Sequence, residues 1–203
     1  MTINLQKGQK IDLTKGNAGL SDLIVGLGWD PIESSGGGGF LKGLFGGKKT
    51  EFDCDASVLL LDANGHLTRK EHMIYFNNLK SPCGSVAHLG DNRTGDGDGD
   101  DEQVLIQLPN VPAEVHNIVF IVNIYDCQAR KQDFGMIKNA FIRVVNKSNM
   151  EEIMRFNLTE NYAGKTALIV GEVYRHKGEW KFAARGESTQ DISLSAVVGR
   201  YTK

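Results

Sequence analysis

Apolar and polar residues alternate along most of the chain, and this two-residue period predicts strands rather than helices. Residues 118–125 are the most apolar segment and predict a strand buried on both faces, and residues 52–62 pass from alternation into a similar apolar run. Further strands are predicted at residues 3–5, 11–13, 23–31, 73–76, 103–108, 140–146, 153–158, 166–174 and 180–184. About ten strands therefore make up most of the predicted fold.

Short turns and little helix accompany these strands. Lys177-Gly178 predicts a hairpin turn. Asp133 is placed to cap a single helical turn, and residues 191–198 predict a C-terminal helix capped by Thr189 or Asp191. This pattern predicts a mainly β fold, a two-sheet antiparallel β-sandwich with a few short helices, and the 203 residues fit one domain, residues 1–203.

A glycine-rich stretch at residues 34–49 interrupts the strand pattern. It carries seven glycines around four large apolar side chains, which predicts a flexible hairpin insertion. The spacing does not fit a phosphate-binding loop, because Lys42 stands where the first glycine is required. Its exposed Phe-Leu and Leu-Phe pairs would suit contact with a partner or a membrane surface.

The most acidic part of the sequence is residues 90–102, which hold six carboxylates and four glycines in thirteen residues. So many like charges repel one another unless a cation neutralises them, and the glycines let the backbone fold the carboxylates inward. Oxygen ligands of this kind favour calcium, whereas zinc or copper would require His and Cys, which this stretch lacks. The stretch therefore predicts a calcium site.

Two known acidic motifs fit this stretch poorly. An EF-hand that began at Asp96 would place Asp101 at the turn-glycine position and Gln107 at the position of the bidentate glutamate. A glycine-aspartate β-helix needs many stacked copies, and one is found. A solvated acidic linker is the remaining alternative. The recurrence of acids at Asp96, Asp98 and Asp100 resembles ligand spacing more closely.

Further carboxylates lie at the ends of predicted strands. Asp30 ends one strand, and Asp53 and Asp55 point to the same face of another, about 7 Å apart. Because loops gather at the ends of a sandwich, we expect these acids and the acidic stretch to converge. The candidate metal ligands are Asp30, Asp53, Asp55, Asp91, Asn92, Asp98, Asp100, Asp101 and Glu102.

Composition narrows the class of protein. Apolar residues make up 40% of the chain and charged residues 24%, values that are ordinary for a globular domain. A net charge of −2 without a basic run disfavours nucleic acid as a partner. The N-terminus lacks the apolar segment of a signal peptide, and no apolar run reaches the roughly 18 residues of a membrane span. We therefore expect a cytoplasmic protein.

The cysteines do not indicate a catalytic or metal site. Cys54, Cys83 and Cys127 are far apart, which predicts reduced thiols rather than a disulfide framework. Cys83 and His88 could act as nucleophile and base, but the sequence marks no third group to orient them.

Four motifs occur in order along the chain: LQKGQK at residues 5–10, VGLGWD at 25–30, FDCDAS at 52–57, and GDNRTG with GDDE within 90–102. Together they resemble the TerD family of tellurite-resistance and general stress proteins. The resemblance implies a cytoplasmic, calcium-binding β-sandwich with calcium in the acidic motif. Cys54 stands where the family more often has Leu, and the long glycine-rich stretch suggests the stress-protein branch.

These observations predict a non-enzymatic calcium-binding module linked to resistance against tellurite or other chemical stress. Calcium ions and other stress-response proteins are the expected partners. One alternative is a metal-dependent hydrolase that uses the same carboxylates to activate a water. Another is a scaffold at the membrane surface, held there by residues 34–49.

Overall fold

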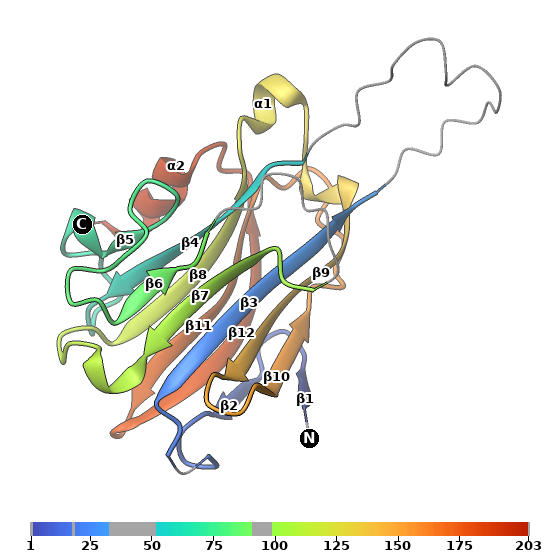
Figure 1. The fold of residues 1–203 in the computed structure, drawn as a ribbon. Helices are drawn as coiled ribbons and strands as arrows, with labels where there is room; N and C mark the ends of the chain where they lie inside the picture. Colours follow the sequence, from blue (N-terminus) through green and yellow to red (C-terminus); the bar gives the residue numbers. More distant parts are fainter. Residues whose placement is uncertain (1, 18, 33–51, 91–98, 203) are drawn as a thin grey trace.

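The computed structural model describes residues 2–17, 19–32, 52–90 and 99–202 as a sandwich of two sheets (Figure 1). The first sheet has the order β1 (Ile3–Leu5), β10 (Glu151–Asn157), β9 (Ile137–Asn146), β3 (Asp22–Pro31), β7 (Glu102–Gln107) and β6 (Val86–His88). The second has the order β2 (Lys10–Asp12), β12 (Glu179–Thr189), β11 (Ala167–His176), β8 (Asn117–Ile124), β4 (Cys54–Leu61) and β5 (Met73–Ile74). The predicted fold class is confirmed.

One strand pairing departs from the antiparallel prediction. β1 runs parallel to β10, with Ile3 opposite Met154 and Leu5 opposite Phe156, while the other named pairings are antiparallel. A three-residue strand at the edge of a sheet carries too little pattern to reveal its direction. The hairpin predicted at Lys177-Gly178 is present between β11 and β12, and both turn residues have the positive φ of a type I′ turn.

The helices are short. The α-helices are α1 (Cys127–Arg130) and α2 (Leu194–Val198), and the 3-10 helices are η1 (Lys70–His72), η2 (Leu108–Asn110), η3 (Phe134–Met136) and η4 (Gly199–Tyr201). Asp133 caps η3 as predicted, because its carboxylate accepts from the Gly135 N–H at 2.7 Å. The predicted cap of the C-terminal helix is wrong. Ser193 caps α2 through its hydroxyl, and the helix begins three residues later than predicted.

The main core lies between the two sheets and includes the fully buried side chains of Leu23, Phe120 and Phe182. A second apolar cluster lies on the outer face of the second sheet, where Val197 of α2 covers Leu59 and Ile121. β4 is buried along its whole length because both of its faces are covered. This double burial explains its continuous apolar run.

Two segments differ from their sequence-based predictions. The predicted strand at residues 73–76 is limited to β5, and Tyr75 continues as an isolated bridge to Asn78. Residues 86–88, which are not among the predicted strands, form β6 at the edge of the first sheet. Among the described residues, no helix is long and apolar enough to cross a bilayer.

Candidate functional site

Acidic side chains gather at one end of the sandwich, where β3 and β8 end and β4 and β7 begin. Asp30 lies at the end of β3, and Asp53 immediately precedes β4. Residues 100–101 lead into β7, whose first residue, Glu102, is paired with Leu27 near the end of β3. Strand order and register thus bring residues far apart in the sequence to the same edge of both sheets.

Part of the predicted site lies outside the described residues. The candidate ligands Asp91, Asn92 and Asp98 belong to residues 91–98, and the glycine-rich stretch 34–49 falls within residues 33–51. Gly90 and Gly99, which flank the first of these segments, are described, and both have positive φ. The candidates that the structure does describe are Asp30, Asp53, Asp55, Asp100, Asp101 and Glu102.

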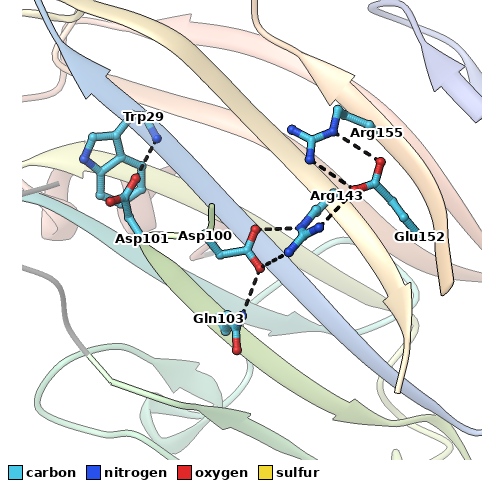
Figure 2. Close-up of polar contacts among 7 residues, drawn as sticks. All are labelled: Trp29, Asp100, Asp101, Gln103, Arg143, Glu152 and Arg155. Carbon is cyan, nitrogen blue, oxygen red and sulfur yellow. Dashed lines mark hydrogen bonds and ion pairs between the residues drawn. The ribbon is translucent and has the colours of Figure 1, made fainter. Parts of the chain in front are cut away.

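Asp100 forms a two-point ion pair with Arg143 of β9 (Figure 2). Arg143 Nε donates to Oδ1 at 2.7 Å, and Nη2 donates to Oδ2 at 3.0 Å. Gln103 Nε2 also donates to Oδ2 at 3.0 Å, and only 1% of the Asp100 side chain is exposed. The hydrogen bonds to Asp100 are the main reason that the pKa of Arg143 is raised. Parallel bonds of this kind fix both position and orientation.

Glycines in β3 make room for this buried carboxylate. A Cβ atom on Gly26 would lie 2.2 Å from Asp100 Oδ2, and one on Gly28 would lie 2.4 Å from a ring carbon of Phe141. Leu27, between the two glycines, points into the core, so both glycines lie on the outer face of the first sheet. Glycine within a strand often marks such a close approach, and the sequence carries this signal.

The ion pair continues across the first sheet into β10 (Figure 2). Glu152 Oε2 accepts from Arg143 Nη1 at 3.1 Å and from Arg155 Nη2 at 3.1 Å. Burial acts to raise the pKa of Glu152, but the bonds from Arg155 and Arg143 outweigh it and lower the pKa. The Arg155 guanidinium also lies 4.1 Å from the centre of the Phe141 ring, within cation–π distance.

Asp101 turns back towards the end of β3 (Figure 2). Its Oδ2 accepts from the Trp29 backbone N–H at 2.7 Å, and its own N–H donates to the Leu27 carbonyl at 2.8 Å. These two bonds fasten the start of β7 to β3 beyond the last regular pair of strand residues. Asp101 therefore holds the acidic segment against the first sheet.

Glu102 points between the sheets and links them. Its Oε2 accepts from the Ala56 N–H of β4, in the second sheet, at 2.8 Å, and lies 3.0 Å from His88 Nε2 of β6. The side chains of Glu102 and His88 are each 1% exposed. A carboxylate buried this deeply needs such partners.

His88 does not face Cys83. Its Nε2 lies against Glu102, and its Nδ1 accepts from the Gly90 N–H at 3.3 Å. The Cys83 thiol instead lies 2.9 Å from the Ser85 hydroxyl and 3.4 Å from that of Ser81. The nucleophile-and-base arrangement that the sequence disfavoured is therefore not formed by these two residues.

The side chains of the other described candidate ligands, Asp30, Asp53 and Asp55, have separate partners or lie on another face. Asp30 Oδ2 accepts from Asn139 at 2.7 Å, and Asp53 Oδ2 pairs with Arg130 Nη2 at 3.3 Å. Asp55 lies opposite Asn123 on the outer face of the second sheet. Within residues 2–17, 19–32, 52–90 and 99–202, no three His, Cys, Asp or Glu side chains meet in a way that could hold a metal ion.

The cysteines differ in their electrostatic surroundings. Burial raises the pKa of Cys54 well above its usual value, and Asp55 and Glu102 add to the effect. Partial burial also acts to raise the pKa of Cys83, but hydrogen bonds from Ser81 and Ser85 outweigh it and lower the pKa. Cys83 is exposed whereas Cys54 and Cys127 are buried, so reactivity is expected only at Cys83.

Comparison with known proteins gives consistent results over nearly the whole chain. The model of the TerD domain matches residues 1–201. The stress response protein SCP2 of Bacillus subtilis is 61% identical over 99% of this chain and 100% of its own. The tellurium resistance protein TerD of Serratia marcescens is 44% identical over 99% of this chain and 97% of its own.

A solved structure shows the same fold. The crystal structure of a homologue of the telluride resistance protein from Streptomyces coelicolor superimposes with a TM-score of 0.63. It covers 88% of this chain and 98% of the other at 18% sequence identity. At this identity the likeness concerns the arrangement of the two sheets.

Proposed function

The chain belongs to the TerD family of stress-response and tellurium-resistance proteins, and from that premise we propose that it binds calcium at the acidic end of its sandwich. The observation that carries the proposal is that Asp53, Asp101 and Glu102, which come from different segments, lie at the same end of the two sheets. Residues 91–98 directly precede Gly99 in the sequence and include the further candidates Asp91, Asn92 and Asp98. Charge so concentrated calls for a counterion.

The chemistry of the donors suits calcium. Carboxylate oxygens and an Asn amide oxygen are hard ligands, and calcium accepts six to eight of them in adaptable geometry. We assign an anchoring role to Asp100, since both of its oxygens already accept hydrogen bonds from Arg143. Asp30, Asp53, Asp55, Asp101 and Glu102 remain candidate ligands together with Asp91, Asn92 and Asp98.

Calcium would act on this protein as a fold-stabilising ligand and as a switch of its surface charge. A ligand that binds only the folded state adds about 2.7 kcal/mol at a hundredfold excess over its dissociation constant. We propose a non-enzymatic role in the cytoplasm, in which the calcium-loaded end of the sandwich contacts other stress-response proteins. No described arrangement of residues favours the hydrolase alternative over this role.

Thermal unfolding tests the proposal directly. The full chain is melted in chelator, in calcium and in magnesium, and calcium is expected to raise the melting temperature by several degrees, about 3 °C for each kcal/mol gained. Asp98→Asn should reduce the rise. Glu114→Gln is the matched control, because Glu114 is exposed just before β8, at the opposite end of the sandwich.

Isothermal titration gives the stoichiometry and separates calcium from magnesium. A melting temperature that is identical in calcium and in chelator, together with no heat of calcium binding, would overturn the proposal. An equal response of the Asp98→Asn and Glu114→Gln variants would place any calcium effect elsewhere on the protein.

A further inference from the structure

A pocket of about 850 Å³ lies on the outer face of the second sheet, away from the core between the sheets. Its floor is formed by β4 and β8, and its walls by α2 and by the segment that contains β5. The volume is within the range of small-molecule sites. The apolar side chains that line it are Leu67, Met73, Tyr75, Phe76, Tyr125, Ile192, Leu194 and Val198.

Three large apolar side chains in the lining are unusually exposed. Phe76 is 41% exposed, Tyr125 is 49% exposed and Ile192 is 49% exposed. They come from three segments distant in the sequence and meet around one cavity. Isolated apolar residues on a surface are common, but a group gathered around a cavity indicates a binding site.

The side-chain oxygen of a buried amide in the pocket has no hydrogen-bond partner. Asn123 is 5% exposed, and its Oδ1 makes no hydrogen bond although it is shielded from solvent. Leaving such an acceptor unpaired is costly in a folded protein, and buried polar atoms normally find a donor. Asn123 of β8 lies opposite Asp55 of β4. These two residues form the polar part of the pocket floor.

The charged groups in the lining are mainly acidic. Asp55, Glu71 and Asp126 contribute carboxylates, and Lys70 contributes the one basic side chain among the described lining residues. A negative potential in a pocket with apolar walls favours a cation over an anion. It also favours a ligand whose polar group donates hydrogen bonds, which is what Asn123 Oδ1 requires.

We propose that this pocket binds a small amphipathic amine, with the apolar body between Phe76 and Ile192 and the ammonium group donating to Asn123 Oδ1. Aromatic side chains on the rim can also contact the cation through their ring faces. The proposal does not depend on calcium binding, although Asp55 lines this pocket and is also a candidate calcium ligand. Amine binding is therefore measured in chelator, so that its failure leaves the calcium proposal standing.

Three probes that share one apolar body test the proposal: 2-phenylethylamine, 2-phenylethanol and phenylacetate. Each is titrated into the full chain, and binding is followed by saturation-transfer NMR and calorimetry. The amine is expected to bind most tightly, the alcohol more weakly, and the acid not at all. Binding of phenylacetate as tight as that of the amine would overturn the proposal.

Two variants locate the binding. Asn123→Leu should weaken the amine about tenfold while leaving the melting temperature equal or higher, because a buried amide oxygen without a hydrogen-bond partner is removed. Phe76→Ala should weaken it about threefold or more, since apolar contact is lost at the rim. Leu79→Ala is the matched control, because Leu79 is 45% exposed but does not line the pocket.

Phe76→Ala tests the site even if Asn123→Leu fails to fold. Phe76 is at the surface, so its variant should keep the native melting temperature. Unchanged amine affinity in Phe76→Ala, or equal losses in Phe76→Ala and Leu79→Ala, would contradict the proposed site. A large drop in stability for Asn123→Leu, with amine binding retained, would show that Asn123 is a structural residue and overturn its proposed role in holding the ammonium group.

Discussion

The guanidinium of Arg143 donates hydrogen bonds to both carboxylate oxygens of Asp100, and this carboxylate packs against Gly26 of the neighbouring strand β3. This arrangement joins the acidic segment to the middle of the first sheet through a carboxylate that is almost fully buried. The position of Asp100, two residues before β7, is therefore fixed by this ion pair.

Replacing the cation of this pair should destabilise the fold. Arg143→Met leaves the Asp100 carboxylate buried without its main partner, and breaking a buried pair costs about 3–5 kcal/mol. We expect the free energy of unfolding, measured by urea denaturation, to fall by about 2–3 kcal/mol. The loss is smaller than for a fully buried pair because the Arg143 side chain is 27% exposed and water can partly replace it. The double variant that adds Asp100→Asn should recover part of the loss. Independent effects of the two substitutions would contradict the coupling.

Adding one methyl group at Gly26, against the Asp100–Arg143 ion pair, should destabilise the fold by a similar amount. Gly26→Ala places a Cβ 2.2 Å from Asp100 Oδ2, and the carboxylate must move away from Arg143. We expect a loss of about 2–4 kcal/mol from overpacking and the displaced ion pair. Gly16→Ala is the control, since a Cβ there meets no atom within 4 Å. Equal stability of the two variants in chemical denaturation would refute the steric argument.

The pH dependence of stability should change when Glu152 is replaced. Its pKa is lowered from 4.5 in the folded protein, so its contribution is present above pH 4.5 and is lost as the pH falls through the lowered value. Glu152→Gln should be about 1 kcal/mol less stable at neutral pH, and the difference from the parent should shrink as the pH falls through the lowered pKa of Glu152. Denaturation at a series of pH values measures it, with Glu114→Gln as the control for an exposed acid.

Alkylation should distinguish the cysteines. Hydrogen bonds from Ser81 and Ser85 lower the pKa of Cys83 from 9.0, whereas burial raises that of Cys54. Iodoacetamide is expected to label Cys83 with half-maximal rate below pH 9.0, and to leave Cys54 unlabelled in the folded protein. Peptide mapping by mass spectrometry reads this out. Ser85→Ala should shift the Cys83 rate profile to higher pH, and an unshifted profile would show that the hydroxyl has no such effect.

Much of the fold could be predicted because the burial of each strand determines the order of apolar and polar residues along it. The run at β4 is continuous because α2 covers its outer face and β3 and β7 lie across the core from its inner face. The alternation in β7 is visible because one of its faces is partly exposed. β1 and β6 each have three residues, too few for a clear period: the sequence predicts β1 but not its direction, and it does not predict β6.

The partners of the acids at the site could not be predicted from local sequence. Asp100, Asp101 and Glu102 are consecutive, yet they point to the outer face of the first sheet, to the end of β3 and into the space between the sheets. Their partners lie as many as 72 residues away in the sequence, which no spacing rule reveals. The glycines of β3 were the one local signal, since a strand keeps glycine where another chain segment presses against it.

Residues 2–12 contribute a strand to each layer: β1 lies beside β10, and β2 lies beside β12. Thr2 thus contacts Glu152, 150 positions later. During synthesis β1 and β2 are made long before β10 and β12, the strands with which they pair. The two sheets should therefore be completed only after β12 has been synthesised, and a chain released before β12 would leave β2 unpaired.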